Sequence, residues 1–103
     1  MKADLVWTPQ AREDLLDIYV AIGCENPGAA ERLYTAIEGT VELLANQPRL
    51  GVRRPEIRRA ARMLVHGPYL IVYEVHPDRA VGPVKNVEIV RVVDGRRDLT
   101  RLF

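Results

Sequence analysis

Arginine is the residue type in this chain that is most suited to chemistry. Of its fifteen basic residues only Lys2 and Lys85 are lysines, and six arginines fall within residues 49–62. A guanidinium group is planar, permanently charged and able to contact a carboxylate or a phosphate through two hydrogen bonds. Residues 1–48 carry eight acids and three bases, whereas residues 49–103 carry six acids and twelve bases. The second half is therefore expected to meet something acidic.

Other residues that do chemistry are sparse. The chain has no serine, and its one cysteine, Cys24, is expected to be a small apolar side chain near a helix end. His66 and His76 lie ten residues apart, and no HxH, HExxH or CxxC spacing exists. A glycine-rich phosphate loop is also missing. These absences argue against hydrolase triads and nucleotide-binding folds, and we predict no metal, no cofactor and no small-molecule substrate.

The composition is that of an ordinary globular protein. With 103 residues, 48% of them hydrophobic and 28% charged, residues 1–103 are predicted to form a single domain. No apolar run approaches the ~18 residues that a membrane span needs. The N-terminus lacks the apolar segment of a signal peptide. We therefore expect a cytoplasmic protein with no membrane partner.

Two helices are predicted in the first half. Residues 4–7 form a short apolar run, and Thr8-Pro9 then provides an N-cap and a proline at the first helical position. Apolar residues at spacings of three and four follow until Gly23. Asn26-Pro27 repeats the start signal for a second helix that runs to about Asn46. The short connection predicts an antiparallel helical hairpin.

Strands dominate the second half. Residues 48–58 are expected to be a loop or a very short element, and strands are predicted at 59–65, 69–75 and 86–93. The predicted class is α+β, with the order β-α-α-β-β-β. An antiparallel three-strand meander and the N-terminal strand form a sheet, and the helical hairpin covers one face of it. The first strand must join this sheet at an edge or beside the last strand.

The two longest predicted strands are apolar on both faces. Within 69–75 alternate residues point to opposite faces, and both sets are largely apolar. In the last strand we expect Val87 and Ile89 on one face. Val90 and Val92 then point to the other face. Because one hairpin covers only one face, the second is either a solvated apolar surface or covered by a partner.

The arginines inside the predicted strands allow two interpretations. Arg62 and Arg91 either pair with a carboxylate of the same sheet, such as Glu74 or Glu88, or form an open cationic surface. Such a surface suits nucleic-acid phosphate or an acidic protein segment. Further arginines from the tail would join it, namely Arg96, Arg97 and Arg101.

An ordered set of short motifs resembles the RelE/ParE superfamily of bacterial toxins from type II toxin–antitoxin systems, and its ParE branch in particular. The resemblance covers nearly the whole chain. Its pieces are Trp7-Thr8-Pro9-Gln10-Ala11, Asp14-Leu15, Ile18-Tyr19, Asn26-Pro27 with Ala30, Leu43-Leu44, Pro48-Arg49-Leu50-Gly51, Tyr69-Leu70-Ile71-Val72-Tyr73-Glu74-Val75, Val87-Glu88-Ile89-Val90-Arg91-Val92-Val93 and Gly95-Arg96-Arg97-Asp98-Leu99. One departure is Asp94, where ParE-like chains often carry a histidine.

The resemblance implies two functions of different classes. ParE-like toxins bind DNA gyrase and trap cleaved DNA, and they are not nucleases. RelE-like toxins are metal-independent endoribonucleases that cut mRNA on the ribosome. Both kinds are neutralised by a small antitoxin, in a hetero-oligomeric complex. Because residues 91–98 contain neither histidine nor tyrosine for proton transfer, we predict a gyrase inhibitor with no catalytic residue, held inactive by a ParD-like antitoxin.

Two alternatives remain open, and each assignment names its own residues. One is a ribosome-dependent ribonuclease that uses Arg62, Arg91 and Tyr73, and the other is a non-toxic module that only binds a partner. The predicted gyrase-inhibition residues are Arg91, Arg96, Arg97, Arg101 and Phe103. The predicted antitoxin-binding residues are Leu15, Tyr19, Arg53, Arg54, Arg58, Arg62 and Tyr73.

Overall fold

The computed structural model describes residues 2–96 and has the predicted element order with one addition. The elements are β1 (Asp4–Trp7), α1 (Pro9–Gly23), α2 (Pro27–Asn46), β2 (Val52–Arg53), β3 (Arg62–His66), β4 (Tyr69–His76) and β5 (Asn86–Asp94). The addition is β2, a two-residue strand inside the segment that was predicted to be a loop or a very short element. The predicted β-α-α-β-β-β class is therefore confirmed.

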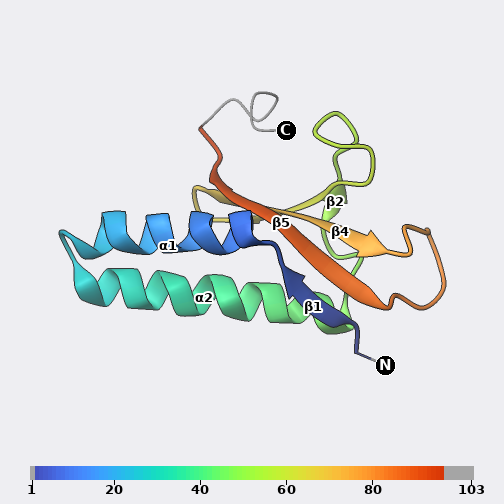
Figure 1. Cartoon of the computed structure of the whole chain (residues 1–103), viewed down its shortest axis with the longest axis horizontal. Helices are drawn as coiled ribbons and strands as arrows, with labels where there is room; N and C mark the ends of the chain where they lie inside the picture. Colours follow the sequence, from blue (N-terminus) through green and yellow to red (C-terminus); the bar gives the residue numbers. More distant parts are fainter. Residues whose placement is uncertain (1, 97–103) are drawn as a thin grey trace.

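The strands form one twisted sheet in the order β1-β5-β4-β3-β2. β1 runs parallel to β5, and the other neighbouring pairs are antiparallel. The first strand thus lies both at an edge and beside the last strand, as predicted. Figure 1 shows β1 crossing from the N-terminus to the start of α1 alongside β5.

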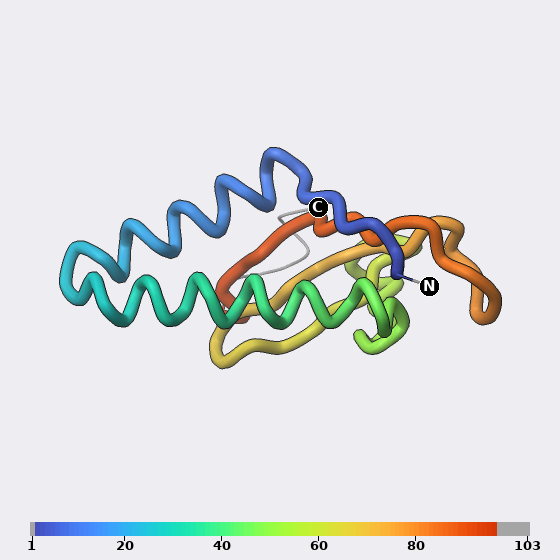
Figure 2. Tube along the Cα trace, turned by 90° about the horizontal axis from the view of Figure 1, so that it is seen from below, coloured from blue at the N-terminus to red at the C-terminus, as the bar shows by residue number. Residues whose placement is uncertain are grey.

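Both helices begin at the predicted caps. The Thr8 hydroxyl accepts a hydrogen bond from the Ala11 N–H at 3.0 Å, and the Asn26 side chain accepts one from the Ala29 N–H at 3.0 Å. The helices lie side by side, and the end of the hairpin that contains their connection projects beyond the sheet (Figures 1 and 2). That end is therefore not covered by strands. Neither described helix has the length and apolar character that a membrane crossing requires.

The core lies between the hairpin and one face of the sheet. Leu15, Ile37 and Leu44 of the helices pack there. The predicted grouping of Tyr69, Ile71, Tyr73 and Val75 on one face of β4 is confirmed, and the structure shows that this face packs against the helices. In β5 the prediction for Val92 was wrong, because Val92 lies in the same core cluster as Val87 and Ile89.

A register shift explains the position of Val92. Tyr73 pairs with Ile89 and the preceding Val72 pairs with Arg91, so Val90 is an extra residue in β5. After such a bulge the alternation of faces is offset by one residue. Val92 therefore points to the helices instead of away from them.

The chain covers part of the second face of the sheet itself. Ile57 and Ala61, from the segment between β2 and β3, pack on Val72, and the half-buried Met63 packs against the same cluster. Farther along this face the residues are polar, because Glu74 and Glu88 are cross-strand neighbours. Neither of the two predicted states of this face was therefore fully right.

Candidate functional site

Arg91 is bound inside the molecule by Asp14 of α1. Its Nε and Nη2 atoms donate to the two carboxylate oxygens of Asp14 at 2.7 and 2.9 Å. Both side chains are largely buried, with exposed fractions of 15% and 9%. Hydrogen bonding to Asp14 raises the pKa of the Arg91 guanidinium. Of the two interpretations of Arg91, the structure supports internal pairing, although the partner comes from a helix and not from the sheet.

Asp14 also accepts a backbone hydrogen bond from β5, at a position where β5 has no neighbouring strand on one side. β1 ends opposite Ile89, so β5 has no strand neighbour on this side beyond that point. There the Val92 N–H donates to Asp14 Oδ2 at 3.0 Å, and the Thr8 hydroxyl donates to the Val90 carbonyl oxygen at 3.0 Å. The start of α1 therefore satisfies backbone groups that would otherwise be unpaired. This double role explains why an aspartate is buried on the inner side of α1.

Tyr73 and Arg62 lie together but are closed off from solvent. They are cross-strand partners on β4 and β3, with exposed fractions of 0% and 7%. The Tyr73 hydroxyl donates to the Pro48 carbonyl oxygen at 2.9 Å and accepts from the Gly51 N–H at 2.7 Å. Burial raises the pKa of Tyr73. The Arg62 Nη1 atom donates to the Gly51 carbonyl oxygen at 3.1 Å.

The residues named for a ribonuclease therefore do not form an exposed active site. Arg62 and Tyr73 hold the backbone of residues 48–51, and Arg91 is occupied by Asp14. A phosphodiester could not reach the buried Arg62 and Tyr73 side chains without rearrangement of the core. For the same reason we do not retain Arg62, Tyr73 or the buried Leu15 as antitoxin-contact residues.

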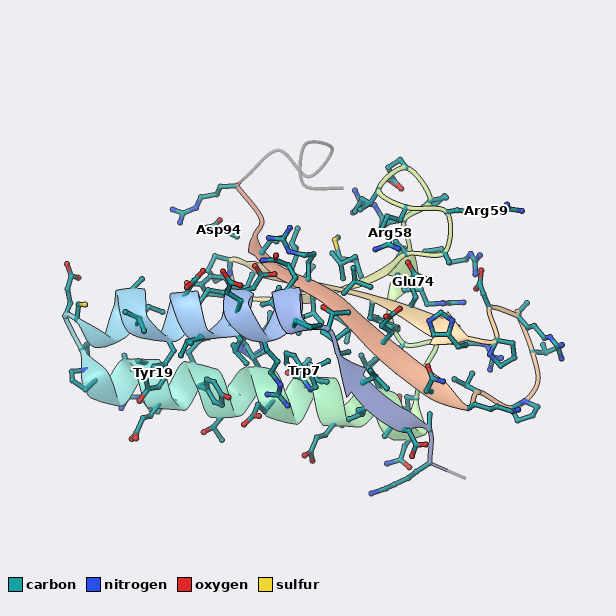
Figure 3. All side chains as sticks on the ribbon, viewed as in Figure 1. Trp7, Tyr19, Arg58, Arg59, Glu74 and Asp94 are labelled. Carbon is teal, nitrogen blue, oxygen red and sulfur yellow. The ribbon has the colours of Figure 1, made fainter. Side chains whose placement is uncertain are left out.

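Most arginines of the segment after α2 form ion pairs or hydrogen bonds within the molecule. Arg53 pairs with Asp78 at 3.0 Å, Arg54 with Glu56 at 2.8 Å and Arg58 with Glu74 at 3.1 Å. Hydrogen bonding to Arg53 lowers the pKa of Asp78. Arg49 donates to backbone carbonyl oxygens at 79 and 82. Three of these arginines are therefore paired with carboxylates, whereas Arg59 points outward from the loop (Figure 3).

An apolar groove lies between the helices on the projecting part of the hairpin. Its volume is about 550 Å³, and it is lined by Leu16, Tyr19, Glu31, Tyr34 and Thr35. The rings of Tyr19 and Tyr34 meet edge to face, with centroids 5.6 Å apart. Tyr19 was a predicted contact residue, and it lies in this groove.

The sequence interpretation missed the most exposed apolar residues of α1. Leu16 and Val20 are 55% and 53% exposed. They are four residues apart, so they form a second apolar strip on α1, one residue out of step with the inward strip at Leu15. That spacing was the available signal. A monomer gains nothing from two exposed apolar side chains beside a groove, so this surface is the main candidate for a partner.

The C-terminal end of the described chain carries one of the predicted gyrase-inhibition residues in an accessible place. The side chain of Arg96 is 84% exposed, and its Nε donates to Asp94 Oδ1 at 3.0 Å. Hydrogen bonding to Asp94 raises the pKa of Arg96. The other predicted residues of this region, Arg97, Arg101 and Phe103, lie outside the described residues.

Comparisons with family models and with solved structures agree. The family described as the ParE toxin of the type II toxin-antitoxin system parDE matches residues 5–99. One solved structure, described as the chromosomal ParDE TA system from P. aeruginosa, has a TM-score of 0.70 and 25% sequence identity. The match covers 90% of this chain and 96% of the other chain. A comparison with curated proteins gave no match.

Proposed function

Because this chain belongs to the ParE toxin family of type II toxin–antitoxin systems, we propose that it inhibits DNA gyrase and is neutralised by a ParD-like antitoxin. The observation that carries the proposal is the family match over residues 5–99. Burial adds support by a different route. The side chains that a ribonuclease would use, Arg62 and Tyr73, are buried in the fold. A toxin that acts by binding needs only an accessible surface.

Gyrase inhibition is tested most directly with purified chain. It should block supercoiling by gyrase and increase the amount of cleaved DNA, and it should leave ribosome-bound mRNA intact. The variant Arg96→Ala is expected to weaken inhibition about tenfold, the range for one exposed charged contact, because Arg96 is 84% exposed. The matched control is Arg59→Ala, another exposed arginine on a different loop.

Two results would exclude this function. Unimpaired supercoiling together with mRNA cleavage on ribosomes would replace it with the ribonuclease alternative. Normal growth of cells that express the chain without an antitoxin would favour the non-toxic partner-binding module.

For the antitoxin we propose the groove between α1 and α2 as its binding site. The exposed Leu16 lines this groove together with Tyr19 and Tyr34, and the exposed Val20 lies one turn farther along α1. The fitting occupant is one face of an amphipathic helix, whose apolar side chains enter at helical spacing. Glu31 also lines the groove and adds a negative charge there. A basic residue on the flank of the antitoxin helix would match this carboxylate.

Leu16→Glu is expected to weaken antitoxin binding by about 30-fold or more, the effect of losing an apolar contact at the centre of an interface. Titration of toxin with antitoxin in a calorimeter measures this. Because Leu16 is 55% exposed, the variant should keep the stability of the unmodified chain. Val81→Glu is the matched control, since Val81 is 79% exposed on the loop between β4 and β5. Equal antitoxin affinities of the Leu16→Glu and Val81→Glu variants would show that the antitoxin does not bind in this groove.

A further inference from the structure

Three side chains that can bind a metal converge on the sheet face opposite the helices. Glu74 and His76 are two residues apart on β4 and therefore point to the same face. Glu88 of β5 lies directly opposite Glu74 in the antiparallel register. One ligand atom from each of Glu74, His76 and Glu88 lies within 4.8 Å of the other two.

The arrangement of charges around these side chains favours positive charge. Two carboxylates directly opposite each other on neighbouring strands repel, which destabilises the pair. Arg58 forms an ion pair with Glu74, with its Nε atom 3.1 Å from the carboxylate. His76 Nε2 lies 3.2 Å from Glu88 Oε1. Glu74 is only 8% exposed, so its charge is poorly solvated by water. A divalent ion between the two carboxylates would serve both at once.

We propose that Glu74, His76 and Glu88 form a binding site for a divalent transition metal, with Zn²⁺ as the first candidate. Zinc bonds to imidazole nitrogen and carboxylate oxygen are about 2.0–2.2 Å long, which puts tetrahedral ligand atoms roughly 3.4 Å apart. The three groups therefore need to approach by at most about 1.4 Å from their 4.8 Å limit. Rotation of His76 and Glu88, 43% and 36% exposed, provides this movement.

The ligand set favours one class of ion. Mg²⁺ and Ca²⁺ prefer oxygen ligands alone, whereas an imidazole suits Zn²⁺, Ni²⁺ and Co²⁺. Water can complete the coordination, because His76 also borders an open hollow of about 450 Å³ together with Pro77, Asn86 and the cationic Arg79 and Lys85. Three protein ligands with an exposed side predict an exchangeable ion instead of a closed structural site.

Arg58 and the metal compete for the same carboxylate. In the absence of metal the Arg58 guanidinium occupies Glu74. The Arg58 side chain is 45% exposed and can turn toward solvent when the ion binds. Loss of this arginine should therefore tighten metal binding, whereas loss of a ligand should weaken it. Opposite changes of zinc affinity in the Arg58 variant and in the ligand variants would distinguish a specific site from nonspecific binding.

The experiment is calorimetric titration of the metal-free full chain with ZnCl₂ at neutral pH. The variants are made in a Cys24→Ala background, because Cys24 is an exposed free thiol that can itself bind zinc. We expect one zinc ion per chain. His76→Gln and Glu88→Gln should each weaken binding at least about tenfold, and Arg58→Gln should tighten it several-fold. His66→Gln, the other histidine, should leave the affinity unchanged.

The result that overturns the proposal is zinc affinity that does not change in His76→Gln, or that falls equally in His66→Gln. Lack of any saturable binding would do the same. Circular dichroism of each variant checks that the fold is retained, which is expected because His76 and Glu88 are only partly buried. As a second readout, Co²⁺ bound to the site should give visible absorption bands that disappear in His76→Gln.

Discussion

Asp14→Ala should lower the free energy of unfolding by about 3–5 kcal/mol, the cost of removing one partner from a buried ion pair. Asp14 accepts three of its hydrogen bonds from Arg91 and the Val92 N–H. Its loss leaves a largely buried guanidinium and an unpaired backbone donor beyond the end of β1. For a chain of this size, total stability is of order 5–15 kcal/mol. Urea denaturation followed by circular dichroism measures the change.

Asp17→Ala is the matched control for this variant. Asp17 lies three residues farther along α1 and is exposed, so the change should stay within about 0.5 kcal/mol. Asp14→Asn should fall between the two, because an amide keeps one acceptor and loses the charge. If Asp14→Ala destabilises no more than Asp17→Ala, the contacts of Asp14 do not stabilise the edge of β5.

Gly51→Ala should destabilise the fold by about 3 kcal/mol, at the upper end of the range for overpacking. A Cβ atom at Gly51 would lie 2.6 Å from the Tyr73 ring and hydroxyl and 2.9 Å from the Met63 carbonyl oxygen. The backbone carbonyl cannot turn aside as a flexible side chain can. Moving Gly51 away would also break its N–H bond to the Tyr73 hydroxyl. Thermal unfolding should show a fall of about 12–24 °C in Tm.

Gly39→Ala provides the control, because nothing lies within 4 Å of a Cβ atom at Gly39 in α2. There the same substitution should stabilise the protein by about 0.5–1 kcal/mol, the helix-propensity difference between the two residues. Tyr73→Phe in the Gly51→Ala background should recover part of the loss, since it removes one of the clashing atoms. Strict additivity of these two changes would contradict the packing assigned to this contact.

Both stability predictions remove or disturb a contact of a residue that the sequence suggested for function. Arg91 and Tyr73 were candidates for chemistry because arginine and tyrosine can stabilise charge and move protons. In the fold they hold the edge of β5 and the backbone of residues 48–51. Within residues 2–96, the surfaces that we propose for partners are the groove at Tyr19 on the projecting hairpin and the exposed Arg96.

The sequence by itself determined the elements and the class of fold. Thr8-Pro9 and Asn26-Pro27 predicted both helix starts, because a capping side chain and a following proline act within one turn of chain. Alternation in 69–75 predicted which side chains of β4 share a face, but not which of the two faces enters the core. These signals are local, so they can be read without knowing which distant segments meet.

Only the tertiary structure decided what the charged residues do. Asp14 and Arg91 are 77 positions apart, and Glu74 meets Glu88 only because β4 and β5 pair in one particular register. The bulge at Val90 turned Val92 toward the helices, which no pattern within β5 alone indicates. Ion pairs and metal-ligand sets depend on distances of a few ångströms between remote segments. Such distances follow from packing and register, and the spacing of residue types along the chain does not contain them.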